Sequence, residues 1–126
     1  MLDNLEILQV LKAQLAFLEK GGYRSQHRYP WRPNFVFEDS PTCINFERPG
    51  EPRPCAECPL MQFVPGDRRE THYPCRHIQL TSRGETVNSF YAWGTEEELE
   101  VALAAWLRRT IRKMEKGDKA VVATPH

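Results

Sequence analysis

The chain has 126 residues, of which 40% are hydrophobic and 27% are charged, as in an average small globular protein with one core. Its 17 Lys and Arg residues balance 17 Asp and Glu residues, so the net charge gives no argument for a nucleic acid or a membrane surface as the partner. No stretch approaches the roughly 20 apolar residues that span a bilayer, and the N-terminus lacks a secretory signal pattern. We therefore expect a single cytoplasmic domain over residues 1–116.

Residues 3–20 are predicted to form the first amphipathic helix. Asp3 is a suitable N-cap with Glu6 three residues later, and Gly21 and Gly22 end the helical pattern. The apolar side chains cover almost half of the helix circumference: Ile7, Leu8, Val10, Leu11, Leu15, Phe17 and Leu18. So wide an arc is suited to burial within the domain or, as a second interpretation, to contact with a protein partner or a second copy of the chain.

Segment 23–33 combines arginine and histidine with aromatic residues, and no acidic residue occurs between residues 21 and 36. This mixture is typical of a protein hot spot, an anion site or a single-stranded nucleic-acid site. The alternative is a linker whose aromatic side chains pack on the domain surface. The zero net charge disfavours nucleic acid. The candidate binding residues are Tyr23, Arg24, His27, Arg28, Tyr29, Trp31 and Arg32.

Nine of the ten prolines lie between Pro30 and Pro74, so region 23–93 is predicted to be rich in loops. Within it, "NFVFED", "HIQLTS" and "ETVNSFYAW" are apolar runs typical of short strands, and the last two flank Arg83 and Gly84 as the arms of a hairpin would. We predict two to four antiparallel strands, with the hairpin over residues 76–92. The expected fold class is α+β, with a short antiparallel sheet in a zinc-stabilised, Pro-rich region between two amphipathic helices.

The four cysteines, Cys43, Cys55, Cys58 and Cys75, have the spacing C-x11-C-x2-C-x16-C. A reducing compartment disfavours disulfides, and four thiolates satisfy tetrahedral zinc, so the pattern predicts a structural zinc site. The metal would offset the ordering entropy of a region that buries little apolar surface. His72 and His77 flank Cys75 and are alternative ligands. Arg53 and Arg76 are candidate neighbours that would balance the negative charge of the site.

Other uses of these cysteines stay open at this point. An iron–sulfur cluster takes the same ligands, and Cys58 is followed by Pro59 as in ferredoxin ligand runs, although those runs hold three closely spaced cysteines. Disulfides or free thiols are a further alternative. Dithiol catalysis by Cys55 and Cys58 is disfavoured, because "ERPGEPRP" before them is not a strand that leads into a helix.

The segment "CINFERPGEPRPCAECPL", residues 43–60, resembles the cysteine-bearing segment of some bacterial PAS-type sensor domains. In those domains a cysteine precedes a C-x2-C-P-L run by a similar distance. The resemblance covers 18 residues and implies bacterial sensing or signalling. It carries no residue role to this chain.

Residues 95–116 are predicted to form the second long helix, with a capping box from Thr95 and Glu98 and a stop at Gly117. Acidic residues at its start and basic residues at its end match the helix dipole, which accounts for the Arg and Lys cluster between residues 108 and 116. Residues 117–126 are predicted to be a flexible tail. The apolar stripe consists of Leu99, Leu103, Trp106, Leu107, Thr110, Ile111 and Met114.

No catalytic motif was found: G-x-S-x-G, the Walker motif and H-E-x-x-H are missing from the sequence. Glu38 and Asp39 are adjacent carboxylates, which we assign to a surface loop. The sequence therefore predicts a non-enzymatic, zinc-binding interaction or regulatory module with a protein partner. The alternatives are an iron–sulfur redox or sensor protein and a nucleic-acid-binding protein that uses segment 23–33.

Overall fold

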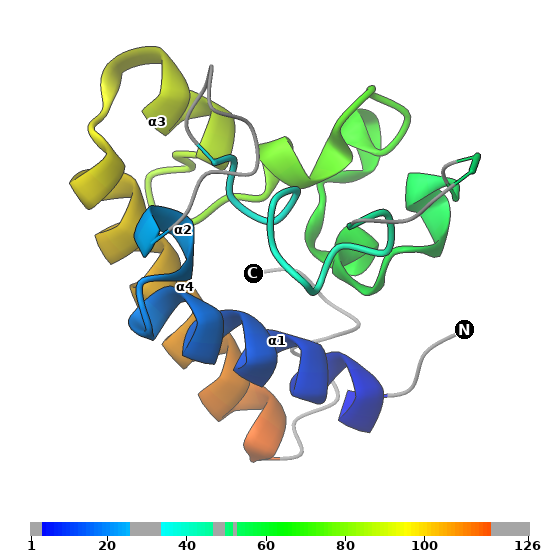
Figure 1. Ribbon diagram of the computed structural model, residues 1–126, viewed down its shortest axis with the longest axis horizontal. Coiled ribbons are helices and arrows are strands. Elements are labelled where there is room, and N and C mark those ends of the chain that lie inside the picture. The colour runs from blue at the N-terminus through cyan, green and yellow to red at the C-terminus, as the bar shows by residue number, and fades with distance from the viewer. Residues whose placement is uncertain (1–3, 26–33, 47–49, 52, 117–126) are drawn as a thin grey trace.

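The computed structural model of the chain describes residues 4–25, 34–46, 50–51 and 53–116. Two long helices, α1 (Asn4–Glu19) and α4 (Glu96–Glu115), lie side by side on one flank of the molecule (Figure 1). Two shorter helices are α2 (Gly22–Ser25) and α3 (Val87–Trp93). Four 3-10 helices occupy the opposite flank: η1 (Cys55–Glu57), η2 (Pro59–Phe63), η3 (Gly66–Arg68) and η4 (Pro74–His77).

The core forms where α1 packs on α4. All seven residues of the apolar stripe predicted for the second long helix are buried in α4. The buried apolar residues of α1 are Ile7, Leu11 and Leu18, which follow the spacing of one helix face. The predicted N-cap of α4 is also present, because Thr95 accepts a hydrogen bond from the Glu98 amide and the Glu98 carboxylate accepts one from the Thr95 amide. Local pattern and tertiary packing therefore agree in this pair.

One buried residue of α1 is polar. Gln14 is fully buried and lies on the same face as Leu11 and Leu18. Its amide group donates to the Tyr23 hydroxyl and accepts hydrogen bonds from Ser40 at 2.9 Å and Thr42 at 2.8 Å. Gln14 thus joins α1 to α2 and to the turns that follow residue 34, and its polar atoms are satisfied inside the core.

The middle region, defined here as residues 53–80, is built differently. Its 3-10 helices are three to five residues long, and prolines stand at or just before the start of each one. It inserts individual apolar side chains into the core rather than one continuous face. These residues are Leu60, Val64, Ile78 and Leu80, and Phe63 adds an edge-to-face contact with Trp106 at a centroid distance of 5.3 Å.

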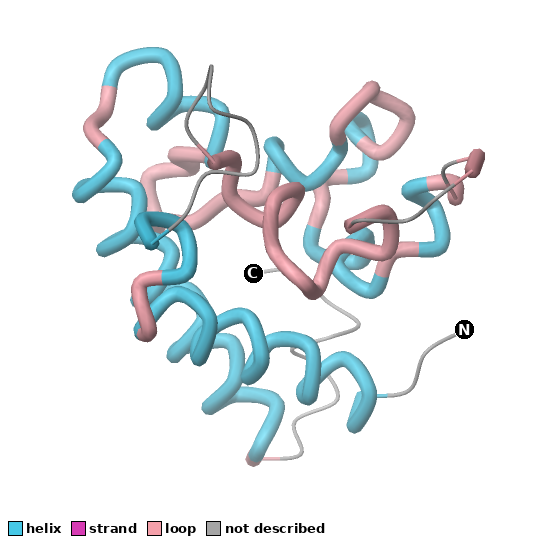
Figure 2. Tube along the Cα trace, in the orientation of Figure 1, coloured by secondary structure: helices cyan, strands magenta, loops and turns pink. Residues whose placement is uncertain are grey.

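The predicted antiparallel sheet is wrong, and so is the α+β fold class. The described part of the chain is helical and contains no strand (Figure 2). A reversal does occur near Arg83 and Gly84, but it forms only an isolated bridge between Gln79 and Thr86. Thr86 then forms a capping box with Ser89 and starts α3, so that "VNSFYAW" is helical. The cap decides this segment, because its apolar run fits either period.

The run "NFVFED", predicted as a strand, forms tight turns over residues 36–39. Phe37 has a positive φ of 67° and is buried, and the Asp39 carboxylate accepts a hydrogen bond from the Phe35 amide at 2.6 Å. Side-chain bonding of this kind competes with strand pairing. Within the described ranges, no helix is both long and apolar enough to cross a lipid bilayer. The predicted tail, residues 117–126, lies outside the described residues.

Candidate metal centre

The four cysteines border one cavity of about 220 Å³. They arrive from three separate segments of the chain: Cys43 from the turns after residue 40, Cys55 and Cys58 from η1 and its end, and Cys75 from η4. All four are free thiols. The rest of the wall is largely apolar, with Phe37, Ile44, Leu60, Met61, Val64, Tyr73 and Pro74, and it also includes the polar residues Glu38, Asp39 and Asn45.

Short-range backbone hydrogen bonds position the central pair of cysteines, Cys55 and Cys58. Pro54 precedes η1, and the Cys58 amide closes this turn by donating to the Cys55 carbonyl at 2.9 Å. Pro59 then starts η2, and the Leu60 amide donates to the Cys58 sulfur at 3.4 Å. An amide that points at a cysteine sulfur stabilises negative charge on it, which is what a metal-bound thiolate carries.

The thiols border the cavity rather than converging on one point. Among the described residues, no three side chains of the His, Cys, Asp and Glu types lie close enough together to hold one ion. The two alternative ligands stand apart from the thiols. The His72 ring is exposed and packs edge-on against Tyr73 at 4.4 Å, and His77 lines a different cavity with Asp67, Gln79 and Thr86.

Burial favours the neutral form of three of these thiols. Burial is the main reason that the pKa of Cys58 is raised to about 11; the neighbouring Cys43 and Cys55 contribute to this shift, whereas the Leu60 amide opposes it. Burial is also the main reason that the pKa values of Cys55 and Cys75 are raised, with a smaller contribution from the Glu38 carboxylate. A bound cation would reverse this preference, because metal binding deprotonates its thiol ligands.

Glu38 was assigned to a surface loop from the sequence, but it lines the cysteine cavity. Its carboxylate accepts two hydrogen bonds from Arg76, at 2.7 and 2.9 Å, and both side chains are largely buried. The Arg76 guanidinium also lies 4.6 Å from the Phe35 ring centre and 4.4 Å from that of Tyr73. In this bidentate pair the Arg76 cation neutralises the Glu38 carboxylate at the edge of the cavity. Only the tertiary structure reveals the pair.

The other predicted neighbour, Arg53, pairs with Glu57 through its Nε at 2.8 Å. Its backbone amide donates to the Asn45 side chain at 2.7 Å, and the Asn45 amide group donates back to the Arg53 carbonyl at 3.1 Å. Asn45 therefore fastens the segment that carries Cys43 to the start of the segment that carries Cys55. Arg53 itself is exposed, so its positive charge is screened by solvent.

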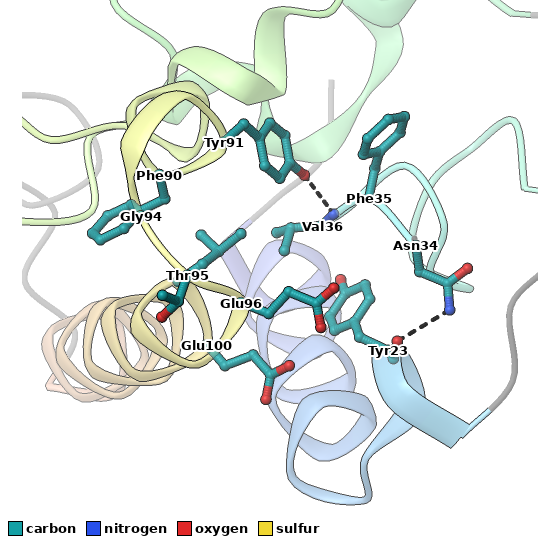
Figure 3. Close-up of a pocket in the computed structure, with 11 residues that line it drawn as sticks. Tyr23, Asn34, Phe35, Val36, Phe90, Tyr91, Gly94, Thr95, Glu96 and Glu100 are labelled. Atoms are coloured by element: carbon teal, nitrogen blue, oxygen red, sulfur yellow. Dashed lines mark hydrogen bonds between the residues drawn. The ribbon is translucent and has the colours of Figure 1, made fainter. Parts of the chain in front are cut away.

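A second cavity, of about 200 Å³, lies between Tyr23, the segment 34–36 and the junction of α3 with α4 (Figure 3). The Tyr91 hydroxyl accepts a hydrogen bond from the Val36 amide at 2.8 Å, and the Asn34 side chain donates to the Tyr23 carbonyl at 3.1 Å. Glu96 and Glu100 stand at one side of it. Arg24 pairs with Glu100 at 2.6 Å, so this cationic side chain is bound within the molecule.

The candidate binding segment 23–33 is described only in part. Tyr23 is a core residue that packs edge-on against Phe17 at 4.9 Å and bonds to Gln14 and to the Phe37 amide. Arg24 has the ion pair given above. The remaining candidates, His27, Arg28, Tyr29, Trp31 and Arg32, lie outside the described residues.

Comparison with known proteins assigns no family or relative. No protein-family model, curated protein or solved structure matches the chain.

Proposed function

We propose that the chain is a non-enzymatic interaction or regulatory module in which a metal centre bound to Cys43, Cys55, Cys58 and Cys75 holds the middle region in place. One observation carries the proposal: four thiols from three separate segments line the same cavity. Four cysteine thiols are the donor set of structural zinc and of iron–sulfur centres.

The physical reason for a metal lies in the middle region. Its short 3-10 helices have few internal hydrogen bonds, and it contributes only scattered side chains to the core. A metal joined to Cys43, Cys55, Cys58 and Cys75 would cross-link three separate segments of the chain. The free energy of metal binding would then contribute directly to folding of this region.

The residues around the thiols have separate roles in this proposal. The Leu60 amide would stabilise the negative charge on Cys58, and the paired Arg76 would keep Glu38 from adding an uncompensated charge beside the centre. Asn45 would keep the segment of Cys43 near that of Cys55. We assign no catalytic step to any of them.

We infer that the partner is a protein and that the chain acts in the cytoplasm, where a reducing environment keeps thiols available for metal. Among the described residues, the exposed large apolar side chains are Leu5 on α1, Tyr73 just before η4, Trp93 on α3 and Val101 on α4. Leu5 lies on the helix for which the sequence predicts a second contact surface, so α1 is also the proposed surface for a homodimer. The ion-paired state of Arg24 weakens the nucleic-acid alternative.

The proposal is tested by counting protected thiols with and without a chelator. We expect that the purified protein protects four thiols from alkylation, that chelation exposes them, and that proteases then cut the middle region before they cut α1 or α4. Four reactive thiols in the untreated protein, or two disulfides, would remove the proposal. Cys75→Ser tests the ligand set, and Thr71→Ser is its control because Thr71 lies in the same region outside the cavity wall.

A further inference from the structure

The second cavity, of about 200 Å³, takes no part in the proposed function (Figure 3). Four aromatic side chains line it: Tyr23, Phe35, Phe90 and Tyr91. The full charges that its wall carries at neutral pH are two carboxylates, those of Glu96 and Glu100. Glu96 is exposed, so the cavity opens to solvent on that side. Among the described residues, its wall therefore combines aromatic rings with negative charge and without positive charge.

The two carboxylates outnumber the cations beside them. Glu96 and Glu100 lie about one helical turn apart on α4, and both face the same guanidinium. Arg24 Nε is 2.6 Å from Glu100 and 3.8 Å from Glu96, and Arg24 does not line the cavity. In the described ranges, no other Lys or Arg side chain forms an ion pair with either carboxylate. One positive charge faces two negative charges, so a net negative charge remains at the open side of the cavity.

The aromatic part of the wall also suits a cation. The ring centres of Phe35 and Tyr91 lie 5.5 Å apart, and aromatic rings attract ammonium and guanidinium groups. Arg76 makes this contact from outside the cavity, with its guanidinium 4.6 Å from the Phe35 ring centre and 5.8 Å from that of Tyr91. Because Glu38 neutralises Arg76, Arg76 does not cancel the negative charge at the open side. The rings and the carboxylates therefore favour the same sign of charge.

We propose that this cavity binds a small organic cation, with an amidinium, guanidinium or ammonium group attached to an apolar body. The cationic group would lie at the open side against Glu96 and Glu100, where it keeps part of its hydration, and the apolar body would contact the aromatic wall. Carboxylates repel anions and give a neutral molecule no ionic partner. A cavity of about 150 Å³ holds a benzene ring, so a cation with one ring fits. The two cavities share no lining residue, so this site does not depend on a bound metal.

Three probes with the same ring and similar shape but different charge test the proposal on the wild-type chain. Benzamidinium is a cation at neutral pH, benzamide is neutral and benzoate is an anion. We expect benzamidinium to bind about tenfold more tightly than benzamide, to shift the amide resonances of Val36, Tyr91 and Glu96, and benzoate not to bind. Equal affinities for benzamidinium and benzamide, or no shift with benzamidinium, would overturn the inference and leave the proposed function intact.

Single substitutions test which side chains bind the cation. Glu100→Gln should weaken benzamidinium binding by about fivefold, the effect of a partly exposed ion pair. Arg24→Gln should strengthen it, because the competing guanidinium is removed. Glu97→Gln is the matched control, since it makes the same charge change at an exposed residue of α4 outside the cavity wall, and it should leave the affinity unchanged. Equal losses in Glu100→Gln and Glu97→Gln, or weaker binding in Arg24→Gln, would contradict the proposed site.

Discussion

The helical pair, α1 with α4, and the middle region lie in the same small protein but are stabilised in different ways. Each long helix buries a face spaced at three and four residues, so a large part of its apolar surface is shared with the other helix. The middle region has no such face. It places isolated side chains in the core and relies on turns, prolines and the Glu38–Arg76 pair.

This difference shows that apolar periodicity is sufficient to stabilise the helical pair but insufficient to stabilise the middle region. A helix with one buried stripe gains packing free energy at every turn. A region of 3-10 turns gains it at a few positions, and it must offset a similar loss of backbone entropy for each ordered residue. We therefore expect the helical pair to control global stability and the middle region to depend on its cross-links.

The largest expected effect comes from the helical pair. Leu103 is fully buried on α4, so Leu103→Ala should lower the free energy of unfolding by about 2–5 kcal/mol, the loss typical of a core leucine. Urea denaturation, followed by circular dichroism and by tryptophan fluorescence, measures it. Val101→Ala is the control on the same helix, because Val101 is 71% exposed. Equal losses in the two variants would show that α4 does not form the core of the protein.

Alkaline pH tests the same core through Tyr23. Burial raises the pKa of Tyr23 to about 12, whereas the unfolded chain loses this proton near pH 10. The stabilising contribution of the neutral hydroxyl is therefore complete below pH 10 and is lost as the pH rises to 12, a loss of about 2–3 kcal/mol.

The control for this pH effect is Tyr23→Phe, which cannot ionise. Its free energy of unfolding should fall less steeply than that of the wild type between pH 10 and pH 12. Parallel pH profiles for the two proteins would mean that Tyr23 is accessible to solvent and does not lie in the core.

A smaller, regional effect is expected from the ion pair of the middle region. Arg76→Gln removes a bidentate partner from a largely buried carboxylate, and should cost about 1–3 kcal/mol. Arg53→Gln is the matched control, since its pair with Glu57 is half exposed and should contribute less than about 1 kcal/mol.

Hydrogen exchange shows where the two arginine variants act. Faster exchange in η4 and in the turns at residues 36–39, with little change in α1, is expected for Arg76→Gln. Equal acceleration of exchange in α1 would mean that the middle region and the helical pair unfold as one unit. The proposed difference in how the two regions are stabilised would then be wrong.

The smallest expected effect compares the two capping boxes. Thr95 caps α4 in the helical pair, and Thr86 caps α3 next to η4. Replacement of either by alanine should cost about 1 kcal/mol, as for other N-cap threonines. Thr95→Ala should lower the midpoint of global denaturation, whereas Thr86→Ala should mainly accelerate hydrogen exchange in α3. If Thr86→Ala instead lowers the midpoint of global denaturation and Thr95→Ala has only a local effect, α3 would contribute more to global stability than α4.

The two regions also differ in how much of them the sequence predicts. The stripe from Leu99 to Met114 and the Thr95 cap are local patterns, and both occur in α4 as predicted. The run "ETVNSFYAW" was wrongly predicted as a strand, because a short apolar run fits either period until the Thr86 cap forms with Ser89. Gln14 has no predictive signal, since a polar residue on a helix is normally exposed.

For the candidate site, the spacing of the four cysteines predicts which residues belong together, and the structure brings all four to one cavity. Glu38 could not have been found in this way. It is 38 residues from Arg76 in the sequence, and nothing in the local pattern indicates that the two side chains meet.

The sequence by itself determined the two long helices, the apolar stripe that α4 buries and the apolar residues Ile7, Leu11 and Leu18 that α1 buries, because these depend on periodicity, caps and residue type. Only the tertiary structure decided that the region between the helices forms turns and short helices instead of a sheet. It also decided the size of the cysteine cavity and the partners of Gln14 and Arg76. The physical reason is distance along the chain: these features depend on contacts between segments whose individual patterns are weak.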